Sequence, residues 1–496
     1  MGAMLSCLPE IREARDREMH RVRPFIAIAA ALLLAAPVRA QQEERLPAAV
    51  ARALKAASVP PSAVAVLVQD VDARMPRASF NADRAMNPAS VMKLLTTYAA
   101  LELLGPAYTW KTEAWATGPL RDGVLEGDLV LKGHGDPKLG FEQFWLLLRQ
   151  LRARGLREVR GDLVLDRSHF AANGHDPGRF DGEPLRPYNV GPDALLLNYK
   201  AIRLSFLPDA ATKTLAVSAE PAPVQLDVVN LLKLAEGHCG SAWYEGVRMD
   251  LAHTDAAARL ILTGSYPAAC GEKSRHVAVL GHPQFVAGVF RQLWGELGGT
   301  LQGGWREATL PAGARLLARA ESPPLAEVVR EINKYSNNVM ARQLYLTLGA
   351  ETAKRPARAE DGEAAIRNWL SQKQLRMPEL AIENGAGLSR SERISAESLG
   401  RLLAAAFASP VMPEFIASLP LAGVDGTMRK RLGGNGVAGQ AHVKTGYLDG
   451  ARALAGYVLD RRGKRTIVVF LANHPNAGAT KAAQDALLAC VYERSC

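Results

Sequence analysis

A change in the sequence pattern partway along the chain, from helical patterns to short strand-like runs, sets the strongest limit on what the chain can fold into. From Tyr108 to about His282 the sequence is rich in Gly, Pro, Asp and short alternating apolar runs, which predict strands and turns. The segments before and after this stretch carry helical patterns, and the last one also contains three strand-like runs separated by tight-turn residues. This arrangement predicts an α+β scaffold, an antiparallel sheet flanked by helices, that a strand-rich insert interrupts.

The chain length of 496 residues exceeds one ordinary core, so more than one domain is expected. We predict that residues 41–107 and 283–496 build one domain, and that residues 108–282 form an insert of one or two further domains. Within the insert the string Gly-Asp-Leu-Val-Leu occurs twice, at Gly127–Leu131 and Gly161–Leu165. Two copies are too few for a solenoid, so paired strands of similar composition explain the repeat better.

The first forty residues have the pattern of an export signal. Two arginines precede an apolar run over Phe25–Ala36, and Val38-Arg39-Ala40 resembles a cleavage site. The run is shorter than the roughly 20 residues that a membrane-spanning helix needs. A buried N-terminal helix is the less favoured alternative. We therefore predict that residues 1–40 are removed after Ala40, and that the protein is periplasmic without a transmembrane anchor.

The cysteines agree with an oxidising compartment. Of the five, Cys7 lies in the predicted leader and the other four form an even set. Four cysteines allow three pairings. Sequence proximity favours Cys239–Cys270 and Cys490–Cys496, and unpaired core thiols are the alternative.

Neither a metal site nor nucleic-acid binding is predicted. The ten histidines form no His-x-His or His-Glu-x-x-His cluster, and the cysteines show no C-x-x-C spacing. The net charge of +10 is spread along the chain without a basic block, which suits an acidic cell-wall polymer better than a nucleic acid. We expect no cofactor.

Three short motifs occur in one order along the chain. Ser90-Val91-Met92-Lys93 is the single S-x-x-K, Lys444-Thr445-Gly446 is the single K-T-G, and Ser336-Asn337-Asn338 is the one S-x-N between them. Each motif alone is weak evidence, because short patterns recur by chance. Their local contexts add specificity: Asn87-Pro88 predicts the start of a buried helix that carries the serine, S-N-N falls between two helices, and K-T-G ends a predicted strand, 438–445.

On these motifs the chain resembles the low-molecular-mass class C penicillin-binding proteins, D-alanyl-D-alanine carboxypeptidases that are often also endopeptidases. The 242 residues between Lys93 and Ser336 are typical of class C in particular. The resemblance implies a transpeptidase domain similar to penicillin-binding proteins and serine β-lactamases, and it covers nearly all of the chain after the leader. Further strings similar to the family are Gly133-His134-Gly135-Asp136-Pro137, Asn384-Gly385-Ala386-Gly387-Leu388-Ser389-Arg390 and Gly423-Val424-Asp425-Gly426-Thr427. One departure is Asn384, where relatives often carry Asp.

The spacing of Ser90 and Lys93 places both side chains on one helical face, where they can meet. A serine hydroxyl becomes a good nucleophile only when a neighbour takes its proton. Lys93 can do so only when uncharged, and burial beside a second cation, Lys444, would lower its pKa. We therefore expect Ser90 to be the nucleophile and Lys93 its general base.

The resemblance implies the remaining roles. Ser336 corresponds to a proton shuttle between Lys93 and the leaving amine, and Asn338 to a residue that binds a substrate amide. Lys444, Thr445 and Gly446 correspond to the segment that binds the terminal carboxylate of a D-Ala-D-Ala peptide. The backbone N–H groups of Ser90 and Tyr447 are expected to form the oxyanion hole.

The expected function is therefore a serine DD-peptidase that acts on peptidoglycan stem peptides through an acyl-enzyme on Ser90, with β-lactams as covalent inhibitors. The balance between carboxypeptidase and endopeptidase activity stays open, because both use the same acyl-enzyme step. Two alternatives remain: a β-lactamase on the same scaffold, and an inactive protein that binds the cell wall.

Overall fold

The computed structural model describes residues 46–496 apart from residues 173, 210, 254–256, 355 and 435. The described residues belong to one compact unit. The predicted leader, residues 1–40 with its cleavage site at Ala40, lies outside them. Over the described ranges, none of the helices is long and apolar enough to cross a membrane.

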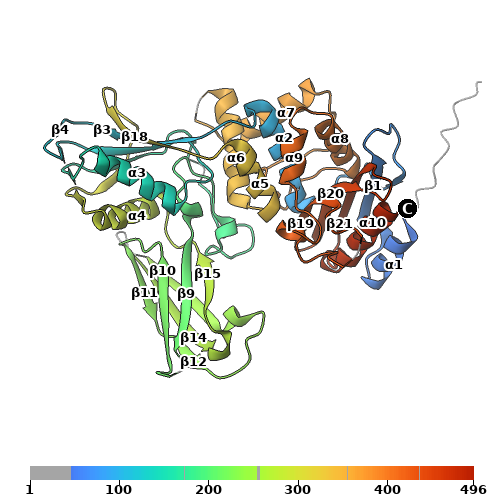
Figure 1. Ribbon diagram of the computed structural model, residues 1–496, viewed down its shortest axis with the longest axis horizontal. Coiled ribbons are helices and arrows are strands. Elements are labelled where there is room, and N and C mark those ends of the chain that lie inside the picture. Colours follow the sequence, from blue (N-terminus) through green and yellow to red (C-terminus); the bar gives the residue numbers. More distant parts are fainter. Residues whose placement is uncertain (1–45, 173, 210, 254–256, 355, 435) are drawn as a thin grey trace, which may run out of the picture. The chain divides into compact units, whose positions relative to one another are not determined.

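A five-stranded antiparallel sheet forms the centre of the part that carries the motifs (Figure 1). Its strand order is β19-β20-β21-β1-β2. The strands are β1 (Val64–Asp70), β2 (Ala78–Phe80), β19 (Ala441–Leu448), β20 (Ala451–Leu459) and β21 (Arg465–Asn473). Val64 on β1 is paired with Ala472 on β21, so segments far apart in the sequence complete one sheet.

Strand β1 shows why this sheet is covered on both faces. Successive side chains of a strand point to opposite faces. On one face Val64, Val66 and Val68 belong to a core shared with Leu487 near the end of the chain, and on the other Ala65 and Leu67 belong to the main helical core. A strand that is buried on both faces has apolar residues at successive positions, and this explains the continuous apolar run in the sequence.

Helices pack on each face of this sheet (Figure 1). The helices are α1 (Ala48–Ala56), α2 (Lys93–Leu104), α5 (Leu325–Tyr335), α6 (Asn338–Ala353), α7 (Ala359–Gln372), α8 (Ala396–Phe407), α9 (Met412–Ser418) and α10 (Lys481–Glu493). Helices α1 and α10 pack against each other, and α8 packs against β1 and β21. Helix α2 is buried continuously from Lys93 to Leu101, as its apolar residues on most faces predict.

The K-T-G motif lies inside a strand and not at its end, so the predicted strand 438–445 is wrong at both bounds. Strand β19 continues through Tyr447 and Leu448, the first exposed and the second buried. This alternation extends the strand until the tight turn at Asp449-Gly450, where Gly450 has a φ of 80°.

The first and last segments of the insert together form two sheets and two helices. One sheet has the order β17-β8-β6-β3-β18 and the other β16-β7-β5-β4. Their elements are β3 (Lys111–Ala116), β4 (Leu120–Arg121), β5 (Val124–Leu125), β6 (Leu129–Gly133), α3 (Phe141–Ala153), β7 (Glu158–Val159), β8 (Leu163–Asp166), α4 (His282–Glu296), β16 (Thr300–Leu301), β17 (Trp305–Glu307) and β18 (Arg315–Glu321). The repeated Gly-Asp-Leu-Val-Leu strings supply β6 and β8, which pair with Leu129 opposite Leu163. The prediction that the repeat marks paired strands is confirmed.

The middle segment of the insert forms two further sheets. The first has the order β10-β9-β15; in the second, β11, β12 and β13 all pair with β14. The strands are β9 (Ile202–Asp209), β10 (Thr214–Glu220), β11 (Leu226–Asn230), β12 (Lys233–Ala235), β13 (Val247–His253), β14 (Ala258–Pro267) and β15 (Lys273–Val277). A disulfide joins Cys239 to Cys270, one of the pairs that sequence proximity favours.

Strand pairing extends the insert beyond its predicted end at residue 282. Helix α4 contributes to the core of the insert, β17 pairs with β8, and β18 pairs with β3 over six residue pairs. The segment 283–321 was expected in the helical part because α4 has a helical pattern. A helix pattern does not show which sheet the helix covers, and the return to the helical part comes after Glu321.

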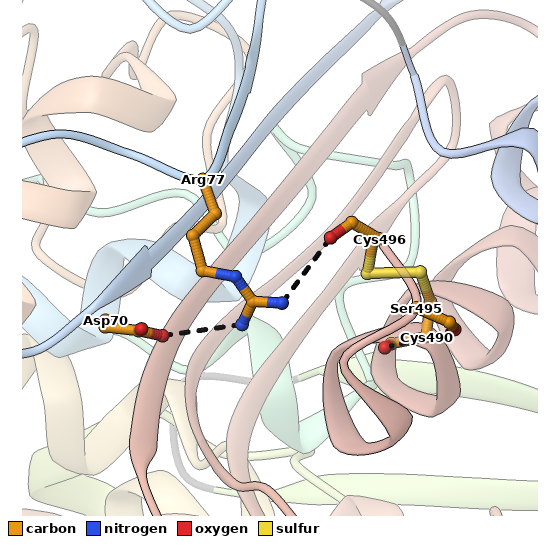
Figure 2. Close-up of a disulfide and its surroundings, with 5 residues drawn as sticks. All are labelled: Asp70, Arg77, Cys490, Ser495 and Cys496. Atoms are coloured by element: carbon orange, nitrogen blue, oxygen red, sulfur yellow. Dashed lines mark hydrogen bonds and ion pairs between the residues drawn. A yellow bond between two sulfur atoms is a disulfide. The ribbon is translucent and has the colours of Figure 1, made fainter.

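A second disulfide closes the end of α10, where Cys490 is joined to Cys496 (Figure 2). Arg77 donates a hydrogen bond to the Cys496 carbonyl and another to Asp70 Oδ1, each at 3.4 Å. Ser495 N–H also donates to the Cys490 carbonyl at 2.9 Å. The two hydrogen bonds from Arg77 attach the segment after α10 to the end of β1.

Candidate active site

A short 3₁₀ turn, Ala89–Met92, carries the serine of S-x-x-K, and α2 begins only at Lys93. The sequence predicts an α-helix that starts at Asn87-Pro88, with Asn87 as its N-cap, and carries the serine; this prediction is wrong. Asn87 Oδ1 accepts a hydrogen bond from the Ala89 N–H at 2.9 Å, and Ala89 has a φ of 46°. Asn473 on β21 fixes Asn87 in turn through two hydrogen bonds, at 2.7 and 3.0 Å. Asn87 holds a tight turn, since an Asx side chain readily bonds to backbone two residues on.

Lys93 contacts three oxygen atoms from three parts of the chain. Its Nζ lies 3.0 Å from Ser90 Oγ and 2.7 Å from Asn338 Oδ1, and it also donates to the Ala386 carbonyl. The side chain has no exposed surface. The serine and lysine expected to meet therefore do so, and two further acceptors orient the amine.

The surroundings of Lys93 favour its uncharged form. Burial is the main cause that lowers its pKa well below the ordinary value, and the nearby cations Lys444 and Arg342 act in the same direction. The carboxylate of Glu392 opposes them. An amine in this environment can accept the Ser90 proton near neutral pH, which an ordinary lysine cannot.

The second buried lysine, Lys444, is hydrogen-bonded to the serine of the S-x-N motif. Lys444 Nζ lies 2.8 Å from Ser336 Oγ and donates to the Thr445 carbonyl at 2.8 Å. Burial lowers the pKa of Lys444 to about 7. Ser336 lies at the junction of α5 and α6 with a φ of 58°. The Thr445 hydroxyl is 2.7 Å from that of Thr427, which belongs to the Gly423–Thr427 string.

Two glycines approach the serine turn very closely. A Cβ added at Gly446 would lie 2.6 Å from the Pro88 carbonyl oxygen and 3.0 Å from Ser90 N. A Cβ at Gly387, where φ is +76°, would lie 1.9 Å from the Ala89 carbonyl oxygen. Both positions need glycine because backbone lies against backbone there.

A hollow of about 460 Å³ adjoins this centre. Its lining includes Arg342, Leu388, Ser389 and Arg390, together with Phe180 from the insert. Leu388 and Phe180 belong to the same apolar cluster as Ala89, and the guanidinium of Arg390 lies 4.5 Å from the Phe180 ring centre. The hollow therefore begins next to the serine turn.

Three contributors to this centre were missed by sequence reasoning. Ala386 offers its carbonyl to Lys93, and Tyr188 of the insert accepts a 3.4 Å hydrogen bond from Asn338 Nδ2 through its own carbonyl. A backbone carbonyl leaves no signature in the sequence. Glu392 is a fully buried carboxylate in a loop. The sequence signal that could have identified it is its position, a charged residue directly after the Asn384–Arg390 string.

Comparisons with known proteins give matches over most of the chain. The model of the D-Ala-D-Ala carboxypeptidase 3 (S13) family matches residues 46–492. A D-alanyl-D-alanine carboxypeptidase of Actinomadura sp. (strain R39) is 30% identical over 416 residues, which cover 81% of this chain and 76% of the relative. The crystal structure of penicillin binding protein 4 from Haemophilus influenzae has a TM-score of 0.76 at 23% identity and covers 89% of this chain and 99% of that one. A structure of the same protein complexed with a β-lactam has a TM-score of 0.70 at 23% identity, over 88% of this chain and 99% of that one.

Proposed function

The chain belongs to the D-Ala-D-Ala carboxypeptidase 3 (S13) family and is a peptidase, and we propose that it hydrolyses peptidoglycan stem peptides ending in D-Ala-D-Ala, with release of the amine part and transfer of the acyl part to water. The reaction passes through an ester on Ser90, and β-lactams acylate the same oxygen. The observation that carries this proposal is the 3.0 Å contact between Ser90 Oγ and a fully buried Lys93.

Acylation begins when Lys93, as the neutral amine, accepts the proton of Ser90. The Ser90 oxygen forms a bond to the carbonyl carbon of the scissile peptide, and the tetrahedral intermediate collapses with loss of the C–N bond. The leaving amine takes a proton, and the Ser336 hydroxyl, held by Lys444 at 2.8 Å, is the group proposed to pass it on. Water then cleaves the ester and restores the Ser90 hydroxyl.

The backbone N–H groups of Ser90 and Tyr447 are proposed to bind the oxyanion. Support comes from the close approach of Gly446 to Ser90 N, which brings β19 against the serine turn. Removing one such donor typically raises the barrier by about 2.7–4 kcal/mol.

The substrate is proposed to lie along β19. This strand is at the edge of its sheet, so an extended peptide can add to it through backbone hydrogen bonds. Asn338 would bind a substrate amide, while Lys444 and Thr445 would bind the terminal carboxylate. The hollow beside Leu388 has room for the remainder of the stem peptide.

Location follows from the substrate. Peptidoglycan lies outside the inner membrane, so the proposal includes export to the periplasm and removal of the leader after Ala40. Both D-Ala carboxypeptidase and DD-endopeptidase activities are within the proposed chemistry, because each attacks a D-Ala carbonyl.

The test is covalent labelling with a fluorescent penicillin, followed by digestion of purified muropeptides and mass spectrometry. Wild type should be labelled, S90A should not, and wild type should release D-Ala or open cross-linked dimers. Equal labelling of S90A would contradict the proposal. Rapid hydrolysis of nitrocefin without muropeptide products would indicate a β-lactamase. Binding to sacculi without hydrolysis of muropeptides or nitrocefin would indicate an inactive protein that binds the cell wall.

A further inference from the structure

Glu392 is a buried carboxylate that none of the proposed chemical steps uses. It follows the Asn384–Arg390 string, and its own N–H donates to Ser389 Oγ at 3.2 Å. The next residue, Arg393, pairs with Ala381 through backbone hydrogen bonds in both directions. The backbone at Glu392 is therefore fixed at the base of the loop.

One oxygen of Glu392 accepts hydrogen bonds from three backbone N–H groups on the opposite side of this loop. Oε1 accepts from Glu383 and Asn384 at 3.0 Å and from Gly385 at 3.2 Å. Charge-assisted hydrogen bonds to a buried carboxylate are strong, and three convergent donors define the conformation of the turn. Glu392 thus holds the segment 383–385 in place.

The next two residues of the loop touch the nucleophile and its base. Ala386 accepts a hydrogen bond from Lys93 Nζ, and Gly387 lies directly against the Ala89 carbonyl. Thr96 on α2 also donates to the Gly385 carbonyl at 2.7 Å. A shift of the segment 383–385 would therefore move both the acceptor that orients Lys93 and the backbone that supports the serine turn.

Charge gives Glu392 a second connection to Lys93. The charged groups that act on Lys93 are Lys444 from β19, Arg342 from α6 and Glu392, which is the anion among them. Oε2 of Glu392 is buried and has no hydrogen-bond partner in the described part of the chain. Burial raises the pKa of Glu392, while the backbone hydrogen bonds from residues 383–385 and, to a smaller extent, Lys93 when it is protonated lower it.

The geometry points to Glu392 as a positioning residue for acylation: its carboxylate holds the turn that begins at residues 383–385, and this turn contacts Ser90 and Lys93 through Ala386 and Gly387. The negative charge of Glu392 also acts on Lys93. This inference rests on the proposed function, since it concerns the same acylation step. The two contributions separate chemically, because Gln keeps an acceptor oxygen and removes the charge, whereas Ala removes both.

The experiment measures the rate of Ser90 acylation by a fluorescent penicillin from pH 5 to 9 for wild type, E392Q, E392A and E397Q. Removing the anion lowers the Lys93 pKa further, so the acid-side midpoint of E392Q should move to lower pH by roughly one unit. The maximal rate of E392A should fall by roughly 10²-fold, because the turn is no longer held. E397Q is the matched control, as Glu397 is exposed and paired with Arg401 on α8.

The outcomes are distinguishable. Failure to label wild type would contradict the proposed function itself. Labelled wild type with an unchanged midpoint in E392Q would overturn the inference, because a purely structural Glu392 would alter the maximal rate alone. Thermal unfolding of each variant shows whether E392A is folded, and E392Q tests the inference even if E392A is not.

Discussion

Lys444 Nζ lies 2.8 Å from Ser336 Oγ, and this contact repeats the pairing of Lys93 with Ser90 at 3.0 Å. Each lysine is fully buried and each holds the hydroxyl of a different motif. Burying an ammonium costs free energy unless the group is neutral or paired. At neutral pH the unfolded lysines are protonated, so each buried lysine must either lose its proton or lose the hydration of its charge on folding. The two Ser–Lys pairs are therefore expected to lower the stability of the fold, as is common where a site is built for chemistry.

The K93M variant should lose activity and gain stability. Met has similar length without a charge to desolvate, while loss of a general base typically lowers a rate by roughly 10²–10⁴-fold. Penicillin labelling gives the rate, and the thermal midpoint gives the stability. K354M, at the exposed end of α6, is the control for Lys→Met substitution. Normal labelling of K93M would remove Lys93 from its proposed role.

Lys444 should make stability depend on pH in a defined window. Its pKa falls from the model-peptide value of 10.5 to about 7 on folding. Between these values the unfolded chain binds more protons than the folded one, so stability rises with pH. Relative to K444M, wild type should gain on the order of a few kcal/mol from pH 7 to 10. Urea midpoints of both proteins across this range test the slope, and parallel curves would contradict the shift.

Contacts set by helical or strand periodicity could be predicted from the sequence. Ser90 and Lys93 are three residues apart, so one turn brings them together whether it is 3₁₀ or α. The paired strands β6 and β8 were predicted from their repeated string, and the buried α2 from its apolar residues.

Contacts made by loops were beyond prediction. The carbonyl of Ala386 reaches Lys93 because Glu392 shapes the intervening turn. Ala386 lies in the Asn384–Arg390 string, but a backbone contact cannot be read from the residue type, and Glu392 lies outside the string. The pairing of Ser336 with Lys444 depends on how α5 and β19 meet, which the sequence does not state. The insert boundary was misplaced for a similar reason: β18 pairs with β3, a partner about 200 residues earlier.

The close backbone approach at Gly387 should make this position intolerant of any side chain. In G387A the new Cβ would meet the Ala89 carbonyl at 1.9 Å, and a φ of +76° is itself unfavourable for Ala. The serine turn must move, so acylation should fall by roughly 10²-fold or more. G450A is the matched control, because Gly450 has a φ of +80° and open space around its Cβ position. Equal labelling of G387A and G450A would show that the approach does not matter.

The two disulfides should differ in what they contribute to stability. Cys239 and Cys270 are 31 residues apart, and Cys490 and Cys496 are 6 apart. Cross-linking removes more chain entropy from the unfolded state when the closed loop is longer, which gives about 4 kcal/mol for the first bond and about 2 kcal/mol for the second. The hydrogen bonds from Arg77 and Ser495 also remain when the shorter loop is opened. Urea unfolding of C239S/C270S and C490S/C496S, each compared with wild type, should therefore show the larger loss for the first pair. Equal losses, or a larger loss for C490S/C496S, would show that native packing rather than loop closure decides the effect.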